Sequence, residues 1–274
     1  MSVDAAVTPG SLRAPRGWRR LRGLAVRIVT FSWVELEKLR HDRTELLTRM
    51  VQPALWLLIF GTTFNRLHVI DTGPVPYLAF LAPGIIAQSA LFISIFYGIQ
   101  IIWDRDAGLL AKLMATPAPA AALVTGKAFA AGVRSVAQAF CVLVLAYAMR
   151  IHMTYNPFRV LAAMAVVMLG SAFFACLSIT LAGLVRSRDR LMGIGQAITM
   201  PLFFASNALY PVSVMPGWLH WLSRVNPLSY EVDALRALLI GIPSPHPLLD
   251  VAVLVAAAAA GIATASVLLR RLVS

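Results

Sequence analysis

The residues of this sequence that could perform catalysis are not spaced for it. Its 5 histidines are scattered, and none lies in a metal-binding pattern such as HExxH. They are His41, His68, His152, His220 and His246. Gly126 and Lys127 are followed by Ala128, so the Ser or Thr of an ATP-binding P-loop is missing, as is its upstream glycine. We expect neither an enzyme nor a metal or cofactor site, and any energy source would be another polypeptide.

The polar residues inside long apolar stretches are almost all uncharged. They are Gln88, Gln100, Gln138, Gln196 and Asn207, and Arg134 is the charged exception. Ion-coupled transporters place ionisable groups within their membrane spans, whereas neutral amides most often hydrogen-bond between helices. We expect Arg134 to reach toward the nearer membrane surface. The sequence therefore disfavours ion-driven transport.

The apolar stretches that hold these residues are long enough to cross a membrane. Hydrophobic residues make up 59% of the 274 residues and charged residues 13%, against about 45–50% and about 25% in soluble domains. A transmembrane helix needs about 20 mostly apolar residues. The stretches that we interpret as spans, the first being the least apolar, are 51–67, 77–103, 128–149, 160–185, 191–210 and 251–269. The sequence predicts an all-α polytopic membrane protein with six transmembrane helices.

The net charge of +12 indicates how the chain is oriented. Most of the 24 Lys and Arg residues precede the first span, follow the last, or lie between spans two and three or four and five. Cytoplasmic loops are enriched in basic residues, so we predict cytoplasmic termini and contact with anionic membrane lipids. No independent basic domain supports a nucleic-acid partner. Residues 1–23 are predicted to form a flexible basic tail, and residues 24–274 a single membrane domain.

Two segments on the cytoplasmic side are predicted to be amphipathic helices. Residues 24–43 gather apolar side chains on one broad face, which favours a helix lying along the membrane over one packed on the protein's own loops. In residues 104–119, Asp104 and Asp106 suit a helix N-terminus, and Thr116-Pro117 would end that helix. Its apolar stripe consists of Leu109, Leu110, Leu113 and Met114. Such a stripe docks either on neighbouring loops or on a cytoplasmic partner protein.

The segment before the last span, residues 211–250, is expected on the outer side and is not hydrophilic. Prolines divide it into pieces too short to span, which indicates short helices that re-enter the outer leaflet. Trp218 and Trp221 also fit an aromatic belt at the headgroup level, and both interpretations can hold together.

Two runs of residues carry a resemblance to a known family. The first run extends from Asp104 to Pro117 and is followed by Gly126-Lys127. The second extends from Asn207 to Trp218 and continues in Asn226-Pro227-Leu228-Ser229-Tyr230 and Asp233-Ala234-Leu235-Arg236. Both runs resemble type-2 ABC transporter permeases, with the daunorubicin-resistance and nodulation-factor export permeases as the most similar groups. This sequence has Asp106 where the family often has Glu, and Ala111 where it often has an acid, so no salt bridge is expected from Ala111.

The resemblance implies an architecture and a set of partners. Such permeases have six spans, an N-terminal interfacial helix, a cytoplasmic coupling helix between spans two and three, and a re-entrant outer segment before span six. Two permease chains, identical or sister, pair with two copies of a cytoplasmic ABC ATPase that binds ATP and Mg. The expected location is the bacterial plasma (inner) membrane.

The resemblance also implies three groups of functional residues. ATPase coupling is assigned to Arg105, Asp106, Leu109, Lys112, Leu113, Met114 and Thr116, with Glu35 and Arg40 of the interfacial helix. The substrate path, between spans two and five, is assigned to Gln88, Phe92, Phe96, Phe203, Phe204 and Asn207, although each phenylalanine alone also fits plain packing. The outer re-entrant segment is marked by Pro211, Pro216, Trp218, Asn226, Pro227 and Tyr230.

The function expected from these features is export of a hydrophobic or amphipathic substrate by alternating access. Members of the family export drugs, lipids or glycans, and the ATPase subunit would supply the energy. The alternative is a membrane scaffold or assembly protein without transport of its own. A membrane enzyme ranks third because the sequence contains no polar catalytic cluster.

Overall fold

The computed structural model describes residue 37 and residues 43–67, 70–108, 110, 120–185 and 187–269, which form helices joined by turns. The first helical segment consists of α2 (Arg43–Leu55), the π-helix η1 (Trp56–Gly61) and α3 (Thr62–Leu67). The long helices that follow are α4 (Tyr77–Asp106), α6 (Ala120–Ala148), α7 (Pro157–Val185), α8 (Arg188–Phe204) and α11 (Pro247–Leu269). Between α8 and α11 lie the short elements η2 (Val212–Val214), α9 (Gly217–Val225) and α10 (Pro227–Leu239).

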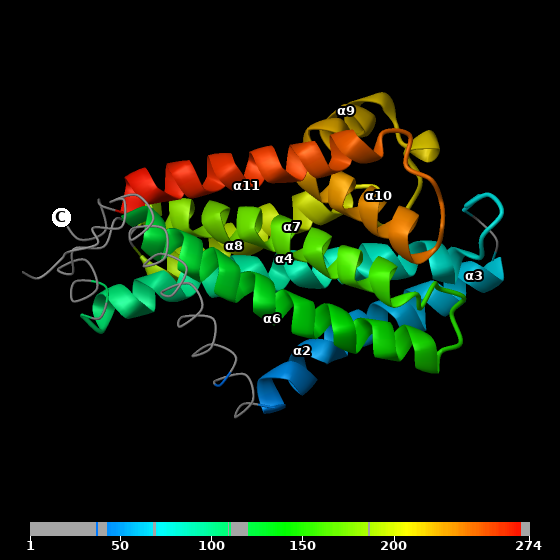
Figure 1. Ribbon diagram of the computed structural model, residues 1–274, viewed down its shortest axis with the longest axis horizontal. Coiled ribbons are helices and arrows are strands. Elements are labelled where there is room, and N and C mark those ends of the chain that lie inside the picture. The colour runs from blue at the N-terminus through cyan, green and yellow to red at the C-terminus, as the bar shows by residue number, and fades with distance from the viewer. Residues whose placement is uncertain are drawn as a thin grey trace, which may run out of the picture.

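Four helices of the described chain, α4, α6, α7 and α11, are long and apolar enough to cross a membrane. They run side by side along the long axis of the molecule (Figure 1). These helices confirm four of the predicted spans as helices of spanning length. The other two predicted spans are not single long α-helices: α8 has 17 residues, and a π-helix divides the first segment into α2 and α3. Pro53, which lacks a backbone N–H, precedes this π-helix within α2.

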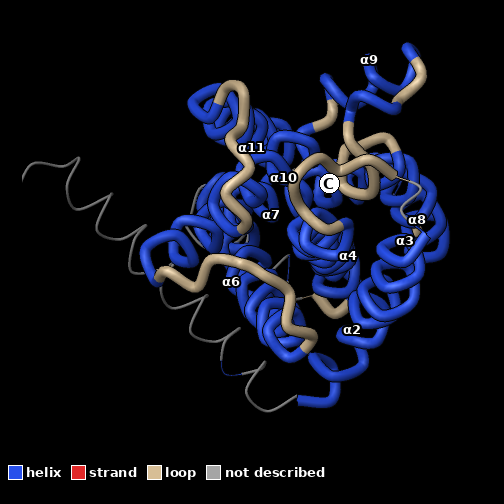
Figure 2. Tube along the Cα trace, turned by 90° about the vertical axis from the view of Figure 1, so that its right-hand side faces the viewer, coloured by secondary structure: helices blue, strands red, loops and turns tan. Residues whose placement is uncertain are grey.

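Helix α4 is the centre of the bundle. It is almost entirely buried and packs against α6, α7, α8 and α10 (Figure 2). It lies very close to α7 at Gly98, where any side chain would collide with Ser178. The hydroxyl of Ser178 donates a hydrogen bond to the carbonyl oxygen of Ile95 at 2.7 Å, so a polar contact also joins the two helices there.

Three predicted boundaries are wrong. Asp104 and Asp106 lie in the last turn of α4 and not at the start of a new helix. Helix α6 begins at Ala120, so Lys127 is helical and not part of the connection. Helix α8 ends at Phe204, so Asn207 lies in a turn beyond the helix. Hydropathy marks only the most apolar section of a helix. Polar residues continue α4 beyond that section, α6 begins before it, and α8 ends within it.

Several predictions fall on residues outside the described part of the chain. These are the tail 1–23, all of the interfacial helix except residues 37 and 43, and most of the stripe in the connection after α4. Leu110 is the one described member of that stripe, and its side chain is fully buried.

The segment before α11, which is predicted on the outer side, contains the predicted short helices. Helices α9 and α10 lie at the end of the bundle opposite the Asp104 end of α4 (Figure 1). Pro211 and Pro216 have extended backbone before η2 and α9. Helix α9 exposes the Trp218 and Trp221 side chains by 67% and 64%, whereas α10 packs into the bundle against α4, α7 and α11.

Substituting Gly98 by valine tests the close contact between α4 and α7. The added side chain would meet Ser178 and the backbone of α7, and overpacking of this kind costs about 1–3 kcal/mol. We expect a lower midpoint of thermal unfolding in detergent. Gly193→Val on α8 is the control, because a Cβ atom there meets open space; an equal effect of both substitutions would contradict the contact.

Candidate functional site

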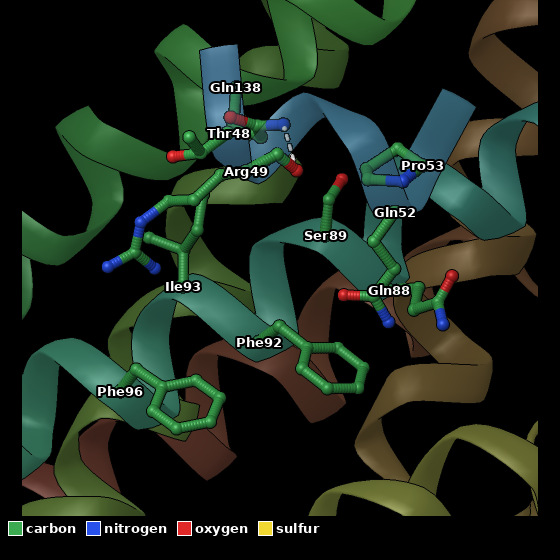
Figure 3. Close-up of a pocket in the computed structure, with 10 residues that line it drawn as sticks. All are labelled: Thr48, Arg49, Gln52, Pro53, Gln88, Ser89, Phe92, Ile93, Phe96 and Gln138. Atoms are coloured by element: carbon green, nitrogen blue, oxygen red, sulfur yellow. Dashed lines mark hydrogen bonds between the residues drawn. The ribbon is translucent and has the colours of Figure 1, made fainter. Parts of the chain in front are cut away.

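A pocket of about 270 Å³ opens between α2, α4 and α6. Helix α4 contributes Gln88 and the two phenylalanines Phe92 and Phe96, which share one face because they are four residues apart (Figure 3). The complete lining is Thr48, Arg49, Gln52, Pro53, Gln88, Ser89, Phe92, Ile93, Phe96 and Gln138. The pocket therefore combines amide side chains with aromatic surface.

Two amide atoms at this pocket have no hydrogen-bond partner among the described residues. They are Nε2 of Gln88, a donor, and Oε1 of Gln138, an acceptor, on side chains only 2% and 1% exposed. Nε2 of Gln138 donates to the carbonyl oxygen of Arg49 at 3.4 Å, which ties α6 to α2 (Figure 3). An unsatisfied buried polar group costs about 1–3 kcal/mol, so these two amide atoms are the buried polar groups of the lining that still lack a hydrogen bond within the described chain.

The other residues predicted to line the substrate path lie elsewhere. Phe203 is fully buried and Phe204 is 44% exposed on α8. Their ring centroids lie 5.5 and 6.4 Å from that of Trp56 in η1, so these aromatic residues join the first helical segment to α8. Gln88, Phe92 and Phe96 thus share one pocket, whereas Phe203 and Phe204 belong to a separate aromatic contact.

Asn207 belongs to a buried polar cluster centred on Arg236 of α10. Nη2 of Arg236 donates to the carbonyl oxygen of Asn207 at 2.7 Å, and its guanidinium lies 3.6 Å from the ring centroid of Phe80 on α4. Nδ2 of Asn207 donates to Oδ1 of Asp233 at 2.6 Å. The carboxylate of Asp233 is 3.9 Å from Nη1 of Arg236. The cluster fixes α10 and the turn after α8 to α4. Asn207 therefore contributes to the packing of these elements in the structure.

Other residues of the second motif, Asn226, Pro227 and Tyr230, shape the junction between α9 and α10. Asn226 caps α10 by accepting a hydrogen bond from the Leu228 N–H at 3.0 Å, and Pro227 occupies the first turn. The Asn226 amide also donates to the carbonyl oxygen of Leu202 on α8 at 2.6 Å. The Tyr230 hydroxyl donates to the carbonyl oxygen of Arg224 at 2.6 Å. These contacts connect α8, α9 and α10.

At the opposite end of α4, an ion pair spans the connection to α6. Nζ of Lys127 lies 2.6 Å from Oδ2 of Asp104, and both side chains are largely buried. The same ammonium lies 5.6 Å from the ring centroid of Tyr97, and the Arg134 guanidinium lies 4.9 Å from it. Carboxylates are unfavourable at a helix C-terminus, and Lys127 offsets the charge of Asp104 there. We call Asp104, Lys127, Tyr97 and Arg134 the α4–α6 clamp.

Only two of the predicted coupling residues are described, and they pair with each other. Arg105 donates from Nε and Nη2 to Oδ1 of Asp106 at 3.0 and 2.9 Å. The others lie outside the described residues: Leu109, Lys112, Leu113, Met114, Thr116, Glu35 and Arg40. Arg134 is only 8% exposed and its guanidinium lies over the ring of Tyr97, so its side chain packs inside the bundle. This contact between Arg134 and Tyr97 depends on how α6 packs against α4, which the spacing of residues in the sequence does not reveal.

Among the described residues, no group of three or more His, Cys, Asp or Glu side chains could hold a metal ion. The pocket, the Arg236 cluster and the α4–α6 clamp all lie in a bundle of apolar helices. The fold and these sites therefore define a polytopic membrane protein.

Comparison with known proteins assigns the chain to a family. Residues 27–240 match the family described as ABC-2 type transporter, and the chain belongs to that family. Its members are membrane subunits of transporters that work with a cytoplasmic ATPase subunit.

Three relatives show the extent of the similarity. The ycf38 protein of Cyanophora paradoxa, which carries the provisional name of transport permease, is 30% identical over 207 residues, covering 73% of this chain and 70% of that protein. Nodulation protein J of Rhizobium leguminosarum bv. trifolii is 29% identical over 222 residues, covering 75% of this chain and 76% of the relative. The daunorubicin resistance ABC transporter permease protein DrrB1 of Streptomyces coeruleorubidus is 24% identical over 226 residues, covering 82% of this chain and 79% of that protein.

Replacing Arg236 by methionine tests the cluster at the base of α10. The change keeps an apolar stem but leaves Asp233 and three backbone carbonyl groups without their cation. A hydrogen bond to a charged group contributes about 1.5–3 kcal/mol and three are lost here, so we expect a large fall in the unfolding midpoint of the purified protein. Arg159→Met, at an exposed position of α7, serves as the control; similar stability of both variants would refute the structural role of Arg236.

Proposed function

We propose that the chain is the permease subunit of an exporter that moves a hydrophobic or amphipathic molecule, such as a drug, lipid or glycolipid, out of the cytoplasm. Membership of the ABC-2 family supports the permease part of this proposal. The observation that carries the substrate class is the pocket between α2, α4 and α6, where unmatched amide groups lie beside Phe92 and Phe96. A molecule with one polar end and one apolar end matches this lining.

In this mechanism the energy is supplied on another chain. Two copies of a cytoplasmic ABC ATPase bind ATP and Mg, close on each other and move the connection between α4 and α6. The α4–α6 clamp lies where that movement would enter the bundle, because Asp104 lies in the last turn of α4 and Lys127 in the second turn of α6. The permease then changes from inward-open to outward-open.

A second permease chain, identical or sister, completes the proposed transporter. The outer surfaces of the first helical segment and of α8 expose the apolar side chains Leu55, Ile59 and Phe204 by 48%, 55% and 44%. Such side chains suit either lipid or a second copy of the same fold. The six-span topology with cytoplasmic termini, in the bacterial plasma membrane, belongs to this proposal: α8 and the first helical segment supply the two further spans.

Transport assays with pocket variants test the substrate site. In inside-out proteoliposomes that also contain the ATPase subunit, ATP should drive uptake of a fluorescent amphipathic dye or a labelled lipid. Gln88→Leu removes a donor in the pocket and should lower transport efficiency about tenfold, which corresponds to about 1.4 kcal/mol. Gln100→Leu is the matched control on the same helix outside the pocket lining.

Two outcomes would contradict the proposal. Equal effects of Gln88→Leu and Gln100→Leu would exclude the pocket as the substrate site. Absence of any ATP-dependent uptake, with both subunits assembled, would favour the scaffold alternative.

Charge reversal tests the role of the α4–α6 clamp in coupling. Asp104→Lys and Lys127→Asp each place like charges together, and each should lower ATP-driven transport about tenfold, equivalent to a coupling free energy of about 1.4 kcal/mol. The double variant restores an ion pair of reversed polarity, so it should recover most of the transport. ATP hydrolysis measured in parallel separates loss of coupling from loss of assembly; a double variant no better than either single one would contradict this role.

A further inference from the structure

The carboxyl group of Glu231 lies in the interior of the bundle. Its side chain is fully buried on α10, the short outer helix that packs against α4, α7 and α11. On the α7 side it lies directly against Gly170, where a Cβ atom would collide with the carboxyl carbon and both of its oxygens. The absence of a side chain at Gly170 therefore creates the space that the carboxyl group occupies.

Neither carboxyl oxygen of Glu231 has a hydrogen-bond partner among the described residues. An ionised carboxylate is far more costly to bury without a partner than a neutral carboxylic acid. The geometry of this contact therefore favours the protonated form while α10 is docked.

The charged and titratable groups around α10 do not supply the missing partner. On α10 and the helices packed against it they are Tyr77, Tyr97, Asp104, Arg105, Asp106, Arg159, Cys176, His220, Arg224, Tyr230, Asp233, Arg236 and Asp250. Arg236 directs its guanidinium to the carbonyl oxygens of Phe80, Asn207 and Ala208, and Asp250 accepts a hydrogen bond from Ser244. The acidic residues at the far end of α4 lie at the opposite end of the bundle (Figure 1).

We propose that Glu231 is a proton-binding site whose neutral carboxyl group holds α10 docked on α7, and that loss of its proton to water releases α10 from the bundle. Deprotonation breaks the carboxyl O–H bond and leaves a carboxylate, which is stabilised by hydration once α10 moves out. This inference goes beyond the proposed function and does not depend on the substrate.

Release of α10 would also affect α8 and α4, because hydrogen bonds join α10 to both helices. The Asn226 cap of α10 is bonded to Leu202 on α8, next to Phe203. Arg236 joins α10 to α4. A proton on Glu231 would therefore control the outer ends of two helices of the bundle.

Infrared difference spectroscopy on the full chain in lipid nanodiscs tests the protonation state. Subtracting the spectrum of E231Q from that of the native chain at neutral pH should leave the carbonyl band of a protonated carboxylic acid. D233N is the control, because the Asp233 side chain is 33% exposed and hydrogen-bonded to Asn207; its difference spectrum should show a carboxylate. A difference spectrum for E231Q that lacks the protonated band would overturn the proposal.

Thiol labelling tests the release of α10. A chain with Cys141 and Cys176 replaced by alanine and with Val232→Cys, at a fully buried position of α10, reports exposure of that helix. The ratio of labelling rates between native Glu231 and E231Q removes the ionisation of the thiol itself. This ratio should rise about tenfold per pH unit while Glu231 is mostly protonated, as its ionised fraction does.

The remaining outcomes also decide the question. Equal labelling of both chains at every pH would overturn the release of α10. G170A, which displaces the carboxyl group sterically, should be labelled at all pH values. If E231Q does not fold, the protonated carboxyl band is followed instead in difference spectra of the native chain between pH values. It must then be lost over the same pH range in which the labelling of that chain rises; changes at different pH would refute the link.

Discussion

The structure depends on the rule that a polar group buried in an apolar bundle must find its partner within the chain. Arg236 is the clearest case, because its guanidinium binds three backbone carbonyl groups, an aspartate and the face of Phe80. That cluster attaches α10 and the turn after α8 to α4, around which the other helices pack. The buried polar atoms without hydrogen-bond partners among the described residues include those of Gln88, Gln138 and Glu231, and the functional proposals lie at these three side chains.

The sequence predicts much of the helical architecture, because uncharged apolar stretches of spanning length have few alternatives to a transmembrane helix. This holds for α4, α7 and α11. It fails at helix ends, where hydropathy carries no information: Asp104 continues α4, and Lys127 already lies in α6. The pairing of these two residues, 23 positions apart, depends on how the helices pack and cannot be read from spacing.

The candidate functional residues also fall into two groups: those whose neighbours the sequence predicts and those whose neighbours depend on packing. Gln88, Phe92 and Phe96 share a pocket because their spacing places them on one face of a single helix, which a sequence reveals. The sequence assigns Asn207 and Phe203 to the same path, but Asn207 lies in the turn after α8 and bonds Asp233, whereas Phe203 packs against Trp56. Glu231 was not identified, because a glutamate in a proline-rich connection has the same sequence pattern as a solvated one.

The central claim is that the pocket between α2, α4 and α6 binds the transported amphiphile. Photo-crosslinking of a diazirine-bearing amphiphile to the purified permease, mapped by mass spectrometry, tests it most directly. The account predicts adducts on Gln52, Gln88 and Phe92 that an excess of unlabelled amphiphile removes and that Gln88→Leu weakens. Adducts spread over the exposed lipid-facing side chains of α7 and α11, unaffected by competitor, would contradict it.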